Sequence, residues 1–393
     1  MTDPGWLRRW LPVAALVPLL LVLASMLPRL LGDAPALPIE DFVEYWAAGR
    51  LHLQGGDPYA IEQLLPLQHQ AGRTDLVYPI QMFNPPWTLP LVVPFGLLPA
   101  RPAHLLWLCL QLAAVVWSAD RLWLLFGGAP EQRFVAWLIA LGFAPTLITL
   151  RMGQISGWLL FSVAAFLVCQ RRGQDFLSGA ALSLASIKPH LLWLVAVAVL
   201  VWAVRERRWP VLRGGLGALA AATGAALACN SDVWRQYGDM LREHPPKASL
   251  SPTIGGWLRD YLGADLFWLQ FLPLALGLAW FAWHWMRQRE VWDWTEQLPL
   301  LLLVSCLTAS YGGWPFDLVV LLVPVIQVAV WAVQAPSLRF RMACLLTFLV
   351  VTTGQLAIRG MEYHIWVTPV LLLAYLACAH AARTSGDAAP RFS

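Results

Sequence analysis

Uninterrupted apolar stretches recur along the whole sequence, and they constrain the fold more than any other feature. Of the 393 residues, 59% are hydrophobic and only 13% are charged, and the mean hydropathy is +0.59; soluble domains are far more polar. Because backbone groups in lipid must be satisfied internally and these runs do not alternate, the spans are predicted to be helices and not barrel strands. We therefore predict an all-α polytopic membrane protein. The first run, residues 10–31, lacks a cleavage site and is predicted to be a retained signal anchor.

The positions of basic and acidic residues predict which side of the membrane each connection faces. Four short connections are basic, at residues 170–175, 205–209, 286–290 and 338–341, and basic loops remain cytoplasmic. The long polar stretch at 33–86 is acidic and is predicted to be external. Alternation between the faces gives roughly twelve crossings with both termini inside. The formal charge of +4 therefore bears on topology, and we expect no nucleic acid partner.

We expect one integral membrane domain over residues 1–393, in a plasma (inner) membrane, with two larger external loops. The first loop covers 33–102, and apolar residues at helical spacing in 41–51 predict an amphipathic helix that lies on the membrane with acids at its start. The proline-broken stretch at 87–98 predicts a re-entrant or surface-lying helix. The second external loop is expected at 230–265.

Metal and cofactor motifs are missing from the sequence. The six cysteines lie in or beside apolar stretches without CxxC or Cys/His spacing, so neither a disulfide framework nor a zinc site is indicated. An acid-rich loop can hold a divalent cation, but no ligand spacing indicates one. No Walker loop, dinucleotide fingerprint or serine-hydrolase elbow occurs. We predict no metal and no cofactor.

One of the only two lysines stands inside an apolar run. Lys188 lies in "SIKPH" (residues 186–190) between two basic connections, so the run must leave the cytoplasmic face and return as two short helices. Pro189 supports a break there, because it removes a helix hydrogen bond. Lys188 and His190 are then predicted to lie at the external face. An ionisable residue in such a place is costly and by default functional.

Other polar residues are predicted to face the same side, and each also has a purely structural explanation. Asp41 and Asp317 can be helix N-caps, Glu44 can lie on a solvated face, and Arg151 can snorkel to the interface. The remaining candidates are Tyr45, Tyr59, Asn84, Gln154, His190 and His364. Cations can stabilise a leaving lipid phosphate and a carboxylate can deprotonate a hydroxyl. The combination therefore indicates a site for one lipid-phosphate substrate and one hydroxyl substrate.

Four motifs resemble, in order and spacing, those of glycosyltransferase family 87, which has the polytopic GT-C fold. They are "DFVEYWAAGRLHLQGGDPY", "NPPWTLPLVVPFGLLP", "GQISGWLLFSVAAFLV" with the following "RRGQDFLSGAALSLASIKPHLLWLV", and "SYGGWPFDLVVLLVP". The resemblance implies inverting transfer of a sugar, typically mannose, from a polyprenyl-phosphate donor to a lipid or glycan hydroxyl on the external (periplasmic) face. The last motif lacks the histidine of members that mannosylate phosphatidylinositol lipids.

The resemblance makes Asp41 the general base. The predicted sidedness adds Lys188, Arg151, His190 and Gln154 as ligands of the donor phosphate. The substrate-binding residues expected around them are Glu44, Tyr45, Tyr59, Asn84, Asp317 and His364. The expected partners are the polyprenyl-linked sugar donor, the acceptor and membrane lipids.

Two other classes of protein remain open at this stage. A transporter or flippase would place polar groups near the midplane on broken helices of inverted repeats, and no internal repeat is evident. An external-face polymer ligase would use a cluster in a late loop, for which His244 and Lys247 are the candidates.

Overall fold

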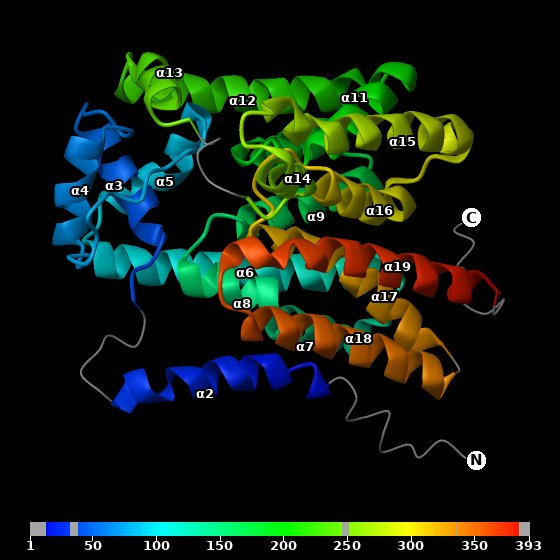
Figure 1. The fold of residues 1–393 in the computed structure, drawn as a ribbon. Helices are drawn as coiled ribbons and strands as arrows, with labels where there is room; N and C mark the ends of the chain where they lie inside the picture. Colours follow the sequence, from blue (N-terminus) through cyan, green and yellow to red (C-terminus); the bar gives the residue numbers. More distant parts are fainter. Residues whose placement is uncertain (1–12, 32–37, 246–250, 336, 385–393) are drawn as a thin grey trace.

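The computed structural model describes residues 13–31, 38–245, 251–335 and 337–384. The described residues form helices joined by turns and loops, without a strand (Figure 1). The predicted all-α fold is therefore confirmed for this part of the chain. Residues 1–12 and 33–37, and with them the predicted position of the N-terminus and the start of the first loop, lie outside the described residues, as does Lys247.

The α-helices follow one another along the chain with short 3-10 turns (η) between some of them. The bounds are α2 Val17–Leu31, α3 Phe42–Leu53, α4 Ile61–Gln70, η1 Pro86–Thr88, α5 Leu89–Gly96, α6 Ala100–Leu125, η2 Pro130–Gln132, α7 Arg133–Gly142, α8 Ala144–Met152, α9 Gly157–Arg171, α10 Asp175–Leu182, η3 Ser183–Ile187, α11 Trp193–Arg205, α12 Trp209–Cys229, α13 Val233–Glu243, α14 Ile254–Leu262, η5 Phe267–Phe271, α15 Leu272–Gln288, η6 Arg289–Val291, α16 Trp294–Leu307, η7 Asp317–Leu321, α17 Leu322–Gln334, α18 Leu338–Ala357, η8 Met361–Trp366 and α19 Val367–Thr384.

Several of these helices are suited to crossing a membrane. Among the described residues, five are long and apolar enough, or six if the bent pair α7 and α8 forms one span. That pair bends by 59° at the break between them, where Pro145 lies in the first turn of α8. Four further apolar helices are shorter. The chain is therefore a multi-pass membrane protein, and the number of twelve crossings stays a prediction.

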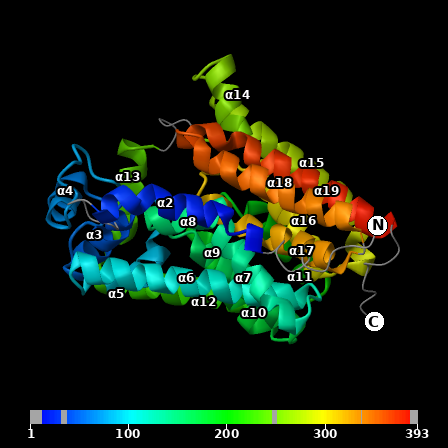
Figure 2. The same ribbon diagram turned by 90° about the horizontal axis from the view of Figure 1, so that it is seen from below.

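The long helices run roughly side by side, so that the connections gather at two ends of the molecule. Helices α3, α4 and α13 lie at one end, and the basic connections α11–α12 and α17–α18 lie at the other (Figures 1 and 2). The two loops predicted to be external thus contribute helices to the same end. Both views place α2 alongside α8.

Helix α3, which begins directly after Asp41, differs from its prediction. We expected an amphipathic helix on the membrane surface, but all its residues except Arg50 and Leu53 are buried by protein. Helix α5 covers one side, where a Cβ added at Gly49 would lie 2.7 Å from the carbonyl oxygen of Val92. A Cβ at Gly96 would lie 2.5 Å from the backbone nitrogen of Arg50. Two glycines therefore let the backbones of α3 and α5 touch, which hydropathy alone does not reveal.

Helices α10 and α12 make a similar close contact. A Cβ at Gly179 would lie only 1.8 Å from the carbonyl oxygen of Val211, and one at Gly214 would lie 1.9 Å from that of Phe176. Small residues permit such approach between membrane helices, where packing replaces the hydrophobic effect. This contact fixes α10, which leads directly into the break at Lys188.

Gly214→Ala is predicted to destabilise the protein, whereas Gly217→Ala on the same helix is not. The first adds a methyl group into backbone and should cost about 1–3 kcal/mol, while nothing lies within 4 Å of the Cβ position at Gly217, so the better helix propensity of alanine should prevail there. Thermal unfolding of the detergent-solubilised variants measures both. Equal melting temperatures would contradict the close contact.

Candidate functional site

The break at Lys188 is held open by polar side chains from distant elements. Helix α10 ends at Leu182, turn η3 continues to Ile187, and α11 begins only at Trp193. Asn84 donates a hydrogen bond from Nδ2 to the carbonyl oxygen of Ile187 (2.9 Å), and Ser305 donates from Oγ to that of Leu191 (2.8 Å). Buried backbone groups outside a helix need such partners, because an unpaired buried N–H or C=O group costs free energy. The predicted break therefore exists, and Asn84 braces it.

The Lys188 side chain is buried and has a partner for each of its hydrogens. Nζ lies 2.7 Å from Asp317 Oδ1, 3.1 Å from Gln154 Oε1 and 3.1 Å from Ser156 Oγ. It also lies 4.7 Å from the ring centroid of Phe316. An ammonium group has three donors, so this one is fully used.

Asp317 is the counter-ion of Lys188, and the alternative that it merely caps a helix is wrong. Its side chain is 1% exposed, and Oδ1 accepts hydrogen bonds from both Lys188 and Ser156, the latter at 3.0 Å. Oδ2 accepts from the backbone N–H of Trp314 at 3.2 Å. A buried charge persists where it is paired and hydrogen-bonded in this way.

Gln154 connects the lysine to Asp41. Its Oε1 accepts from Lys188 and from the Tyr45 hydroxyl (2.8 Å), and its Nε2 donates to Asp41 Oδ2 (2.8 Å). A flipped amide would set its NH2 against the Lys188 ammonium and its oxygen against the Asp41 carboxylate, so the partners fix which atom is oxygen. The structure thus joins four predicted residues, Asp41, Tyr45, Gln154 and Lys188, in one network.

The turn that presents Gln154 depends on a glycine. Gly153 has φ of +69°, in the left-handed region, and a Cβ there would lie 2.7 Å from that of Phe42. The Trp107 indole donates to the Gly153 carbonyl oxygen at 2.9 Å and stacks on Tyr45 with ring centroids 5.5 Å apart. Local backbone geometry and α6 therefore place the amide beside α3.

Asp41 precedes α3 but does not cap it, because its side chain makes no cap hydrogen bond. Burial raises the pKa of this carboxyl, while the Gln154 hydrogen bond and the charge of Lys188 oppose the shift. Glu44, one turn on, is 7% exposed rather than solvated. Burial, and then the charge of Asp41, raises the pKa of Glu44 to about 8. Near neutral pH, Glu44 is therefore mostly protonated.

Three other predicted residues lie outside the hydrogen-bond network of Lys188, Gln154 and Asp41. Arg151 is exposed and takes no part in the network. His190 packs edge-on against Tyr311 (5.5 Å), and burial lowers its pKa to about 4, so it is neutral near pH 7. The Tyr59 hydroxyl donates to the carbonyl oxygen of Asn84 at 3.1 Å and so supports the brace.

His364 is not brought to the network either. Its ring nitrogens lie 3.0 to 3.2 Å from the carbonyl oxygens of Gln355, Gly360 and Met361, at the corner between α18 and α19. Two residues of the network were not predicted, Ser156 and Phe316. The only sequence signal for Ser156 was its place in the motif "GQISG".

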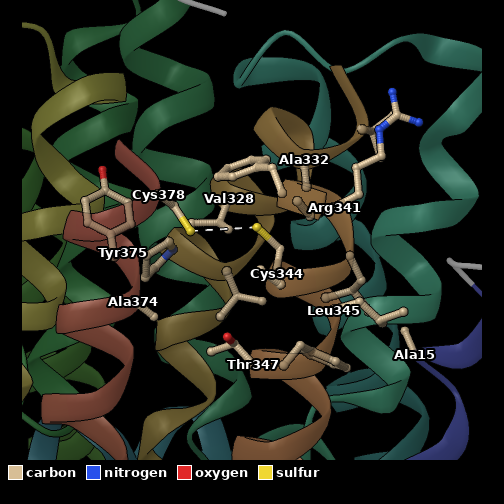
Figure 3. Close-up of a pocket in the computed structure, with 18 of the residues that line it drawn as sticks. Ala15, Val328, Ala332, Arg341, Cys344, Leu345, Thr347, Ala374, Tyr375 and Cys378 are labelled. Carbon is tan, nitrogen blue, oxygen red and sulfur yellow. Dashed lines mark hydrogen bonds between the residues drawn. The ribbon is translucent and has the colours of Figure 1, made fainter. Parts of the chain in front are cut away.

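A separate cavity of about 760 Å³ lies between α7, α17, α18 and α19. Figure 3 shows its largely apolar lining and the thiols of Cys344 and Cys378, whose sulfur atoms are 3.7 Å apart. None of the network residues lines it, and its walls offer few groups that could bind a sugar or phosphate. In the described part of the chain, no group of three His, Cys, Asp or Glu residues could hold a metal ion.

Comparison with known proteins identifies the family. Residues 83–310 match the model of glycosyltransferase family 87. The chain belongs to glycosyltransferase family 87. The family 87 match contains Asn84, Arg151, Gln154 and Lys188, whereas Asp41 lies before it. No curated protein and no solved structure matches the chain. Family membership makes this protein a membrane glycosyltransferase, acting on a sugar donor and an acceptor.

The stability of this family 87 enzyme should fall as the pH rises between about 4.5 and 8, because of Glu44. In that range the folded state keeps a proton that the unfolded state has released, so the free energy of unfolding decreases with pH. Glu44→Gln should remove this slope and stabilise the protein above pH 8.

Melting temperatures at pH 5.5, 7 and 8.5 measure the effect, with Glu62→Gln on the exposed side of α4 as the control. A wild-type melting temperature that changes with pH no differently from that of Glu44→Gln would show that Glu44 ionises normally.

Proposed function

We propose that this enzyme transfers a sugar, in the first instance mannose, from a polyprenyl-phosphate donor to a hydroxyl of a lipid or glycan acceptor. The reaction would occur with inversion in a plasma (inner) membrane, at the external face. The end of the molecule formed by α3, α4 and α13 would be that face, since the basic connections lie at the opposite end (Figure 1).

The observation that carries this proposal is the placement of Asp41. Its Oδ2 is held by Gln154, and in the described part of the chain Oδ1 accepts no hydrogen bond. The residue is half-buried, at the boundary between the buried network and solvent. A carboxylate that is oriented, partly desolvated and open on one oxygen is suited to act as a general base.

The reaction would use Asp41 to remove the proton from the acceptor hydroxyl. The acceptor oxygen attacks the anomeric carbon from the side opposite the phosphate, the bond from that carbon to the phosphate oxygen breaks, and polyprenyl phosphate leaves with the electron pair. One displacement of this kind inverts the anomeric configuration. Since Glu44 is mostly protonated near pH 7, it adds little negative charge beside the phosphate.

Arg151 is the proposed contact for the phosphate. It is exposed and lies three residues before Gln154, at the last turn of α8. His190 is neutral near pH 7, so it can donate a hydrogen bond to a phosphate oxygen but supplies no charge. A guanidinium suits this task because its planar donors match phosphate oxygens.

Asp41→Asn should lower the transfer rate by about 100-fold or more, because the amide cannot accept the hydroxyl proton. The assay uses purified enzyme in lipid nanodiscs with radiolabelled undecaprenyl-phosphate mannose and a glycolipid extract as the acceptor. Asp260→Asn, an exposed aspartate on α14, provides the matched control.

Arg151→Met should raise the KM for the donor about ten-fold, because the guanidinium would no longer bind the donor phosphate.

Near-normal turnover by a folded Asp41→Asn variant would show that Asp41 is not the base. Failure of the wild type to use mannosyl, glucosyl or arabinosyl donors would refute the proposed function and favour transport or polymer ligation.

A further inference from the structure

We propose that Lys188 is a positioning residue for the base and not a ligand of the donor phosphate, and that it acts through the side-chain amide of Gln154. The catalytic part of this inference rests on the proposed function. The contacts that support it lie within the protein and do not depend on any substrate.

The surroundings of Lys188 leave no donor for a phosphate. All three N–H groups point to oxygens, on Asp317, Gln154 and Ser156, at 2.7 to 3.1 Å, and the ring of Phe316 lies 4.7 Å from Nζ. To bind phosphate, the ammonium would have to abandon one of these partners. Abandoning Asp317 would leave a carboxylate that is 1% exposed without its counter-ion, which is strongly destabilising.

Through the amide of Gln154, Lys188 influences the hydrogen bond that Asp41 accepts. With two donors on its oxygen, from Lys188 and Tyr45, the amide is polarised so that its NH2 becomes a stronger donor. That NH2 contacts Asp41 Oδ2 at 2.8 Å. The lysine thereby fixes both the direction and the strength of the hydrogen bond that the base accepts.

The charged groups around Asp41 are Glu40 and Glu44 on its own segment, Arg73 from the loop after α4, and Lys188 from the helix break. Of these, Arg73 is engaged with Asp75 at 2.9 Å and with the carbonyl oxygen of Ile39 at 3.1 Å. Gln154 is the side chain that hydrogen-bonds to the carboxylate. Without it, burial would favour the protonated form of Asp41. As the pH falls, Asp41 would then become protonated, and unable to act as a base, at a higher pH than in the wild type.

Gln154→Leu tests the inference while leaving the bonds among Lys188, Asp317 and Ser156 in place. The acid limb of the pH profile of kcat/KM should move up by about one pH unit, and kcat at a pH on that limb should fall about ten-fold. The KM for undecaprenyl-phosphate mannose should not change. Gln355→Leu is the matched control, because it also removes a buried glutamine, one whose side chain has no hydrogen-bond partner among the described residues.

A double variant tests the lysine itself. Lys188→Met with Asp317→Asn removes both charges together, so that no unpaired buried charge prevents folding. The same shift of the acid limb with an unchanged donor KM is expected. A ten-fold rise in donor KM, with the acid limb unmoved, would instead make Lys188 a phosphate ligand and overturn the inference.

A measurement without substrate separates this inference from the proposed function. Infrared titration follows the C=O band of a protonated carboxyl, and the band that disappears in Asp41→Asn belongs to Asp41. Its midpoint should lie about one unit higher in Gln154→Leu and in the double variant than in wild type. Unchanged midpoints would refute the positioning role even if sugar transfer is observed, and shifted midpoints would support it even if the wild type transfers no sugar.

Discussion

The buried ion pair between Lys188 and Asp317 is the interaction on which the rest of the site depends. A charge buried inside a protein is stable only with a partner, and here the partners are 129 residues apart in the chain. The pair therefore ties the break between α10 and α11 to the start of η7, and Ser156 and Gln154 add the turn before α9. Three segments that are remote in sequence meet at one ammonium group, and Gln154 extends the network from there to Asp41.

Glycine contacts supply the rigidity that this network requires. Gly153 allows the turn that presents Gln154, Gly49 and Gly96 let α3 lie directly on α5, and Gly179 and Gly214 hold α10 against α12. In lipid there is no hydrophobic driving force between helices, so close packing must provide the attachment. Asp41 and Lys188 thus lie beside helices that are in direct backbone contact, and a fixed placement of this kind is what preorganisation of a catalytic group demands.

Much of this could be predicted from the sequence. Hydropathy predicted the membrane helices, Pro189 predicted the break, and the ordered motifs predicted the family. The errors have a common origin. Helix α3 was expected at the membrane surface and Asp317 as a possible cap, because local patterns describe a helix without its neighbours. Contact with α5 buries α3, and Asp317 forms an ion pair with Lys188 instead of capping a helix. His364 was grouped with the site by sidedness alone, and backbone carbonyl groups hold it elsewhere.

By itself, the sequence determined that this protein is helical and embedded in a membrane, that its charges divide between two ends, and that a lysine interrupts an apolar run. Continuous hydropathy and the cost of burying charge are local properties that suffice for those conclusions. Only the tertiary structure decided which polar groups are paired, that the three donors of Lys188 are all used, and that Gln154 links it to Asp41. Hydrogen bonds act over about 3 Å, and that proximity between distant residues is created by helix packing.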